Sequence, residues 1–272
     1  MERKYNICFT KAVASGNDFI VIDNMNGELD ARDIDYSEIA KELCPRRLSI
    51  GADGLLVLER SRKADLRMRT INPDGSEVDM CGNGARCAAL YASIRNMWED
   101  LTIETGAGII SAEIKGKNVK LKMSDPKDLR MDISLGVGQS LMTVHYINTG
   151  VPHAVHLVND IETYDVEGMG RKIRQHNIFS PEGTNADFAG KRADGKMMVR
   201  TYERGVEEET LACGTGTVAT AIIMGLLDQA QSPVSLLTKS GEILKVYFQI
   251  SGKKIDNVYL EGEANIGWEG KV

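Results

Sequence analysis

The stretch CGNGARCAALYASI, residues 81–94, is similar to a second stretch, CGTGTVATAIIMGLL, residues 213–227. Both begin with Cys-Gly-x-Gly and continue into small and apolar residues, and their first cysteines, Cys81 and Cys213, lie 132 positions apart. A segment that recurs in this way is the sequence signature of an internal repeat. The pair predicts a duplicated chain in which each copy carries a long helix that is apolar on nearly all sides.

Three further pairs of segments support the duplication because they keep the same order at nearly the same spacing. They are GNDFIVID from residue 16 with GVPHAVHL from 150, GADG from 51 with NADF from 185, and MRTIN from 68 with VRTYE from 199, at offsets of 134, 134 and 131. Each match alone is weak, but matches in one order at offsets of 131 to 134 rarely arise by chance.

The pattern of apolar residues predicts an α+β fold with two pseudo-symmetric halves, each a mostly antiparallel sheet or barrel wrapped around a central helix. Short runs rich in β-branched and apolar residues are typical of strands. They lie at residues 18–23, 55–59, 101–105, 119–123, 154–158, 197–202, 234–238 and 243–248. The long helices are expected at 85–99 and 217–229, and peripheral helices at 35–44 and 168–175.

The boundary between the halves is expected in the polar, proline-containing stretch SDPKDLRMD, residues 124–132. We predict an N-terminal half, 1–124, carrying Cys81, and a C-terminal half, 125–263, carrying Cys213. The tail, 264–272, is an optional addition to the first half.

Composition limits the partners of the chain. The 272 residues are 42% hydrophobic and carry a net charge of −6, which disfavours nucleic acid and anionic membranes as partners. No apolar window approaches the roughly 18 residues of a membrane span, and the first residues, MERKYNICFTKAV, lack the pattern of a signal peptide. We therefore expect a cytoplasmic protein that binds a small molecule.

The five cysteines are an odd number, dispersed along the chain, and do not predict a disulfide framework. None is spaced as a C-x-x-C zinc pair, so no metal is expected. Cys8 and Cys44 are expected to be small buried apolar groups. No Rossmann glycine fingerprint and no lysine in a pyridoxal context is present, so no cofactor is expected.

Cys81 and Cys213 are different because each is placed at the start of a buried helix. The first N–H groups of a helix lack internal partners and carry the positive end of the dipole, which favours a carboxylate and a thiolate. We therefore expect a lowered pKa at both cysteines. Duplication would place the two thiols on opposite sides of a shared cleft, where one takes a proton from a carbon and the other returns one to its opposite face. That reaction inverts a stereocentre.

The motifs resemble those of the diaminopimelate epimerase family along nearly the whole chain. They are SGNDFIVID, GADGLLVLE, NPDGSEVDMCGNGARC, GVPHAV, TNADF and YERGVEEETLACGTG. The resemblance implies a cofactor-independent epimerase of lysine and peptidoglycan-precursor biosynthesis that interconverts LL- and meso-diaminopimelate. It also implies two similar halves and a homodimer.

Site residues follow from the resemblance by position. Cys81 and Cys213 match the catalytic acid–base pair, and His153 and Glu203 match the groups that set thiol protonation. The substrate-binding positions are Asn17, Asn72, Gly82, Asn83, Gly84, Asn185, Arg204, Gly214 and Thr215. Cys87, inside the apolar helix, is expected to serve packing.

Several alternatives stay open at this point. Val151 stands where the family commonly has asparagine, and residues 12–15 also depart from its pattern, so a racemase of another amino acid is the second hypothesis. A thiol redox sensor or metal-binding protein is the third. Two residues also have structural interpretations: His153, after Pro152, could cap a turn, and Glu203 could pair with Arg204 on the surface.

Overall fold

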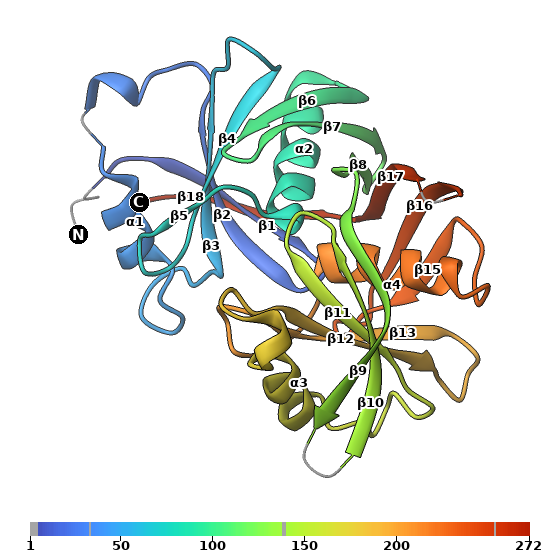
Figure 1. Ribbon diagram of the computed structural model, residues 1–272. Helices are drawn as coiled ribbons and strands as arrows, with labels where there is room; N and C mark the ends of the chain where they lie inside the picture. The colour runs from blue at the N-terminus through green and yellow to red at the C-terminus, as the bar shows by residue number, and fades with distance from the viewer. Residues whose placement is uncertain (1–4, 33, 138–139, 253) are drawn as a thin grey trace. The chain divides into compact units, whose positions relative to one another are not determined.

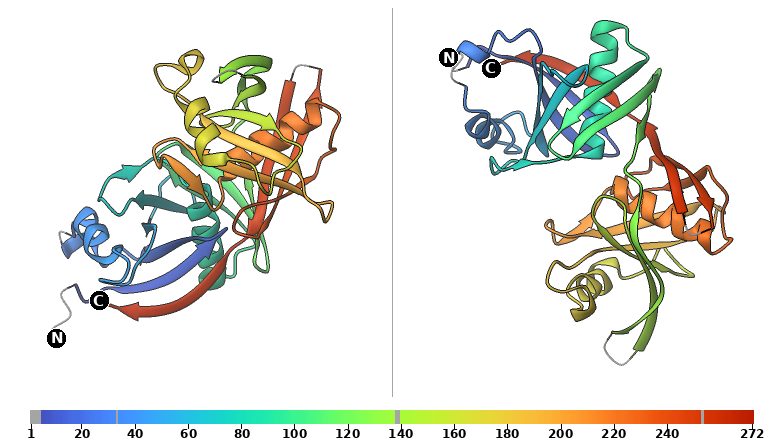
Figure 2. Two further views of the ribbon diagram at one scale, coloured as in Figure 1. Left: turned by 90° about the horizontal axis from the view of Figure 1, so that it is seen from below. Right: turned by 45° about the horizontal axis from the view of Figure 1, so that its top comes forward.

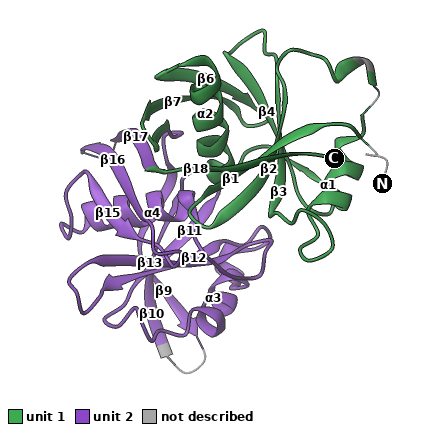
Figure 3. Cartoon of the chain, turned by 180° about the vertical axis from the view of Figure 1, so that it is seen from behind, with its two compact units in different colours: residues 1–121, 262–272 green, residues 122–261 purple. Residues whose placement is uncertain are grey.

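A computed structural model describes residues 5–32, 34–137, 140–252 and 254–272, and Figure 1 shows the course of the chain. The chain separates into two compact units (Figure 3). Residues 1–121 with 262–272 form unit 1, and residues 122–261 form unit 2. Among the described residues, no helix has the length and apolar character needed to cross a membrane.

Unit 1 is a mixed, mostly antiparallel sheet around one helix. Its elements are β1 (Cys8–Ala14), β2 (Asn17–Asn24), the 3-10 turn η1 (Asp30–Arg32), α1 (Tyr36–Leu43), β3 (Gly54–Glu59), β4 (Leu66–Ile71), β5 (Glu77–Val78), α2 (Gly82–Asn96), β6 (Asp100–Thr105), β7 (Gly108–Lys115), β8 (Asn118–Lys122) and β18 (Asn265–Lys271). The pairs β2–β3 and β4–β6 are parallel. The pairs β1–β2, β1–β18, β3–β4, β4–β5, β6–β7 and β7–β8 are antiparallel. The last strand of the chain therefore completes the unit that the first strand begins, and β1 and β18 run side by side in Figure 2.

Helix α2 runs through the strands of unit 1 (Figure 1). Its residues from Asn83 to Ala92 are all buried, and it packs against β1, β2, β6, β7 and β18. Four alanines in this span keep the helix narrow, which lets strands approach it on several sides. Cys87 is fully buried among them, as expected for a packing residue.

Unit 2 has the same internal topology. Its elements are β9 (Lys127–Val137), β10 (Ser140–Asn148), β11 (Pro152–Leu157), α3 (Val166–Arg174), the 3-10 turn η2 (Asn177–Phe179), β12 (Asn185–Lys191), β13 (Met197–Glu203), β14 (Glu208–Thr210), α4 (Gly214–Leu226), β15 (Val234–Leu237), β16 (Ile243–Ser251) and β17 (Lys254–Glu263). The pairs β11–β12 and β13–β15 are parallel, whereas β9–β10, β10–β11, β12–β13, β13–β14, β15–β16 and β16–β17 are antiparallel. Helix α4 is buried from Gly216 to Met224 and packs against β10, β11, β12, β13, β15 and β16.

The two units repeat one set of strand pairings around a buried helix, with β9 beside β10 in unit 2 where unit 1 has β18 beside β1. This repetition confirms the predicted α+β fold with two similar halves. One predicted match is wrong in detail. Phe19 pairs with Gly54 in unit 1, and His153 pairs with Asn185 in unit 2, so the equivalent of Asn185 is Gly54 and not Gly51. The sequence match failed because the segments that precede these two strands differ in length and structure.

Both central helices begin earlier than predicted. They start at Gly82 and Gly214, so the glycines that were expected in a preceding turn form the first helical turn. Cys81 and Cys213 occupy the N-cap positions in extended conformation.

The peripheral helices have ordinary capping signals. Asp35 accepts hydrogen bonds from the backbone N–H groups at the start of α1, and Asp165 does the same for α3. The expectation for Cys8 is wrong, because it is exposed, whereas Cys44 is buried. In β1 the residues alternate between the two faces, and Phe9 takes the inward position.

Candidate active site

Cys81 is the N-cap residue of α2, and its side chain forms a capping hydrogen bond. Its Sγ accepts a hydrogen bond from the Gly84 N–H at 3.5 Å and lies 3.8 Å from Oδ1 of Asn17 on β2. The side chain is half-buried. Cys81 and Asn17, two predicted site residues 64 positions apart, are therefore neighbours in unit 1.

The amide of Asn17 is held in one orientation by an ionic cluster. Its Nδ2 donates to Oδ2 of Asp53 at 2.9 Å, which leaves Oδ1 facing Cys81. Arg46 forms ion pairs with Asp53, at 2.7 Å, and with Asp18. Burial acts to raise the pKa of Asp18, but hydrogen bonds from Arg46 and Lys11 outweigh it and lower the pKa.

Asn83, in the first turn of α2, is oriented by a hydrogen bond from Arg86. The Arg86 guanidinium donates to Asn83 Oδ1 at 2.7 Å and to Ser15 Oγ at 2.8 Å, and it is fully buried. The Asn83 Nδ2 donates to Asn17 Oδ1 at 3.4 Å. Two predicted substrate-binding amides thus contact each other beside Cys81.

The remaining predicted residues of unit 1 differ in their surroundings. A Cβ at Gly84 would lie 3.0 Å from Leu56, so glycine allows α2 to pack closely on β3. A Cβ at Gly82 would meet nothing within 4 Å, so packing does not require glycine there. Asn72 lies in the turn after β4, where its Nδ2 donates to Ser76 at 3.1 Å.

Cys213 holds the equivalent position before α4, but its environment contradicts the expected acidic thiol. Burial raises the pKa of Cys213 well above its ordinary value, and the nearby carboxylates of Glu203 and Asp187 raise it further. The hydrogen bond between Cys213 and the Thr215 hydroxyl and the one from the Gly216 N–H both lower the pKa of Cys213 without reversing the shift. The start of a helix favours a thiolate, but here desolvation and two nearby negative charges have the larger effect.

His153, on β11, is completely buried and hydrogen-bonded at both ring nitrogens. Nδ1 lies 2.7 Å from Asp187 Oδ2, and Nε2 lies 2.9 Å from Thr215 Oγ1. The Thr215 hydroxyl in turn lies 3.4 Å from Cys213 Sγ. The alternative reading of His153 as a turn cap is therefore wrong, and the structure brings three predicted residues of unit 2 together.

Glu203, at the end of β13, is half-buried, which argues against the alternative of a surface pair with Arg204. Burial raises its pKa, against a hydrogen bond from Thr210 and the field of His153, both of which lower it. The Arg204 side chain instead donates to the carbonyl of Glu182 at 3.1 Å. Glu203 thus faces the same cluster as His153 and Cys213.

The side chain of Asn185 forms hydrogen bonds with two nearby backbone groups. Its Oδ1 accepts from the Arg204 N–H at 2.8 Å, and its Nδ2 donates to the Pro152 carbonyl at 2.9 Å. The side chain is only 3% exposed. Asn185 therefore fixes the backbone that carries Arg204 and the backbone next to His153. Gly214 contributes by close packing, since a Cβ there would lie 2.9 Å from Leu260.

Replacing Gly216 by alanine should destabilise unit 2. The new Cβ would lie 2.2 Å from Asp187 Oδ1 and 3.2 Å from His153 Cε1, and neither buried side chain has room to retreat. We expect a loss of about 1–3 kcal/mol in the free energy of unfolding, measured with urea. G82A is the matched stability control, because a Cβ meets nothing there. Equal losses for the two variants would contradict the packing argument.

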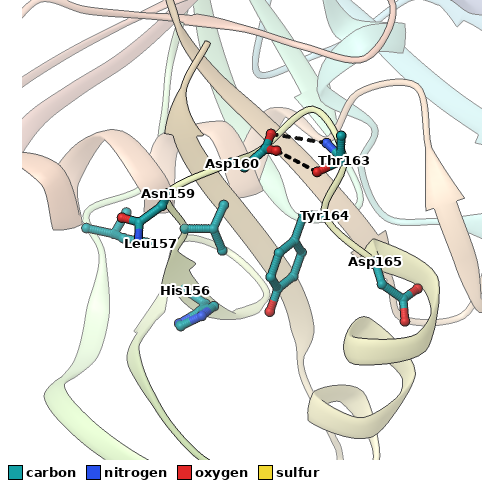
Figure 4. A pocket seen from close by; sticks show the side chains of 8 residues that line it. His156, Leu157, Asn159, Asp160, Thr163, Tyr164 and Asp165 are labelled. Carbon is teal, nitrogen blue, oxygen red and sulfur yellow. Dashed lines mark hydrogen bonds between the residues drawn. The ribbon is translucent and has the colours of Figure 1, made fainter. Parts of the chain in front are cut away.

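A separate hollow of about 580 Å³ lies on unit 2 and is lined by residues 156–160 and 163–165 (Figure 4). Asp160 accepts hydrogen bonds from Thr163 at its rim, and Tyr164 packs against the His156 ring. None of the predicted site residues lines it. The hollow is therefore distinct from the cluster around His153.

Comparisons with known proteins identify the family of the chain. The sequence profile named diaminopimelate epimerase matches residues 9–128 and 145–267. The chain belongs to the diaminopimelate epimerase family. Members named diaminopimelate epimerase from Hydrogenobaculum sp. and Chlorobaculum tepidum are 40% and 41% identical to it. These alignments cover 97% and 95% of the chain, and 97% and 98% of the relatives.

Solved structures outside the family share its fold. A PhzF-family phenazine biosynthesis protein from Bacillus anthracis has a TM-score of 0.74 at 18% identity, covering 98% of each chain. A hydroxyproline epimerase from Agrobacterium vitis, with bound trans-4-hydroxy-L-proline, has a TM-score of 0.68 at 16% identity and covers 100% of this chain and 92% of its own. At this identity the likeness shows the fold alone.

Proposed function

We propose that the chain interconverts LL- and meso-diaminopimelate without a cofactor, with Cys81 and Cys213 as the two acid–base groups. The observation that carries the proposal is the repeated placement of one cysteine at the N-cap of each buried central helix. In this scheme one sulfur, as thiolate, takes the α-proton, and the other, as thiol, gives a proton to the opposite face of the carbon. Membership of the diaminopimelate epimerase family supports the choice of reaction and substrate.

Substrate binding divides between helix starts and polar side chains in this proposal. The backbone N–H groups of the first turns, at Gly82, Asn83, Gly84, Gly214 and Thr215, would hold the reacting carboxylate, because a helix N-terminus attracts anions. Such donors would also stabilise the charge that develops when the α-proton leaves.

The distal amino acid end of the substrate would contact the remaining side chains. Asn17 and Asn72 offer amide groups to an ammonium and carboxylate, and the Arg204 guanidinium suits a carboxylate. The buried Asn185 would act indirectly, by fixing the backbone around the site. The fixed Arg204 backbone, held by Asn185, supports this role.

The direct test is incubation of the purified, reduced protein with LL-diaminopimelate in D2O, without pyridoxal phosphate. We expect meso product that carries deuterium at the inverted α-carbon, detected by chiral chromatography and mass spectrometry. A reduced, folded preparation that neither inverts nor exchanges the α-proton would falsify the proposal. Elemental analysis and a thiol count on the same sample distinguish a metal-binding or disulfide-forming protein.

A racemase acting on another amino acid is the second candidate, and Val151 favours it. This residue precedes Pro152 and is 36% exposed, so an apolar side chain is presented where the family commonly has an amide. Relative kcat/KM for diaminopimelate, glutamate, histidine and proline decides between the two. V151N should raise the preference for diaminopimelate if the missing amide contacts it.

We also propose that the protein is a cytoplasmic homodimer and that its ligand is the small amino acid substrate. The supporting arguments are the net charge of −6, which disfavours anionic surfaces, and the resemblance to the diaminopimelate epimerase family, which implies a homodimer. Light scattering after size exclusion measures the mass, and a monomer across micromolar concentrations would exclude the dimer.

Replacing Glu203 by glutamine should separate stability from activity. Because burial raises the pKa of Glu203, its ionised form destabilises the fold as the pH rises above the ordinary carboxyl pKa. At pH 7 E203Q should therefore unfold at higher temperature, while kcat falls about 10²-fold if the carboxylate assists proton transfer. A variant that is more stable and equally active would remove Glu203 from the mechanism. Calorimetry and steady-state kinetics measure the two effects.

A further inference from the structure

The buried contacts of His153 point to a residue that the proposed function does not use. Asp187 lies on β12, is fully buried, and receives hydrogen bonds at both carboxylate oxygens. Thr201 Oγ1 donates to Oδ1 at 2.7 Å, and His153 Nδ1 lies 2.7 Å from Oδ2. A carboxylate has no proton to give, so the imidazole must donate from Nδ1.

This assignment fixes the role of the other ring nitrogen. In a neutral imidazole with its proton on Nδ1, Nε2 is an acceptor, and its partner at 2.9 Å is the Thr215 hydroxyl. The Thr215 proton is then committed to His153, so its oxygen is left to accept from the Cys213 thiol at 3.4 Å. We call the series Asp187, His153, Thr215 and Cys213 the Asp187–Cys213 relay.

We propose that Asp187 is a positioning residue that holds His153 in the Nδ1–H tautomer, so that Nε2 is available as a proton acceptor at the start of α4. This inference rests on the proposed function. A proton arriving at Nε2 converts His153 to an imidazolium, which the adjacent Asp187 carboxylate stabilises. When it comes from Cys213, the sulfur proton passes to Thr215 Oγ1 as the hydroxyl proton passes to Nε2, which leaves a thiolate and an unchanged threonine.

The surroundings of Cys213 agree with this direction of the relay. Burial raises the pKa of Cys213, so its resting form is the thiol that the relay requires as a donor. Gly216 allows the carboxylate to approach, since a Cβ there would lie 2.2 Å from Asp187 Oδ1. Within the part of the chain that the structure describes, Glu203 is a further charged group that acts on His153, Asp187 and Cys213.

The test combines the histidine tautomer with kinetics in Asp187→Asn. Thr201 donates to Oδ1, so the asparagine oxygen is expected there and its NH2 group would face His153 Nδ1. The tautomer should then invert to Nε2–H. Long-range ¹H–¹⁵N NMR of ¹⁵N-histidine protein should show Nδ1–H in the wild type and Nε2–H in D187N. Because an Nε2–H imidazole cannot accept a proton there, kcat should fall about 10²-fold with KM changed less than threefold.

Two results would decide against the proposal. A wild-type His153 found as the Nε2–H tautomer overturns it, and so does a folded D187N that keeps kcat within threefold of the wild type. T201V is the matched variant, since it removes the other hydrogen bond of Asp187 and should leave the Nδ1–H tautomer in place. If the wild type fails to epimerise any amino acid, the proposed function fails, while the tautomer measurement still decides whether Asp187 positions His153.

Discussion

Replacing Cys213 by alanine should lower the rate of epimerisation at least about 10³-fold, and the same change at Cys81 should have an equal effect. In the proposed scheme each inversion needs both sulfurs, one to remove the α-proton and one to return a proton, so neither can substitute for the other. A positioned acid or base contributes about 10²–10⁴ in rate. Steady-state rates with LL- and meso-diaminopimelate measure the loss.

The partial reaction separates the roles of the two cysteines. A variant that lacks one sulfur retains a base on the other face, so in D2O it should exchange the α-proton of one stereoisomer without inverting it. C81A and C213A should therefore exchange opposite stereoisomers. NMR of the recovered substrate measures this exchange, and two variants that exchange the same stereoisomer would contradict the opposed arrangement.

C8A is the matched control for both substitutions. Cys8 is an exposed cysteine at the start of β1 and belongs to neither helix cap, so its removal should leave the rate unchanged. C87A tests packing, because Cys87 is a fully buried residue of α2. If C8A is inactivated as strongly as C213A, then general thiol loss, rather than position at the helix start, explains the result.

Much of the fold could be predicted because apolar runs bounded by polar residues mark buried strands. All eight predicted strand segments coincide with strands, among them β3 and β13, where apolar side chains are concentrated. Strands such as β9 were not predicted. Most residues of β9 are exposed, and charged residues are interspersed with its apolar ones. A polar segment between two domains has the same kind of composition, so the sequence does not distinguish the two. The same segment was instead read as the boundary between halves.

The candidate site was predicted in part, because the motif positions carry its residues but not their electrostatics. Asp187 lies within the motif TNADF. The pattern of a single strand does not show which side chain of the neighbouring strand lies beside it, so the contact between Asp187 and His153 could not be predicted. The raised pKa of Cys213 was missed for the same reason. A helix start favours a thiolate, but the charges and burial that outweigh it come from β12 and β13.

Arg86 leads to the second large effect, a loss of stability. Its guanidinium is fully buried in α2 and donates to three acceptors from separate segments. These are Ser15 Oγ at 2.8 Å, Asn83 Oδ1 at 2.7 Å and the Glu263 carbonyl at 2.8 Å. Arg86→Lys keeps the buried charge but lacks the planar fork that reaches all three. We expect a loss of about 3–5 kcal/mol in the free energy of unfolding, because the ammonium is left incompletely compensated.

The best control for this prediction lies on the same helix. Arg95, in the last turn of α2, pairs with Glu269 on the surface, and R95K should cost less than about 1 kcal/mol. Urea unfolding at several pH values adds a second criterion. A buried lysine has a lowered pKa, so the deficit of R86K should be largest at neutral pH and should shrink as the pH approaches the pKa of an unfolded lysine, about 10.4. Equal losses in R86K and R95K, or a deficit that does not change with pH, would mean that the fork of Arg86 does not join the turn after β1, helix α2 and the end of β17 in the way its hydrogen bonds indicate.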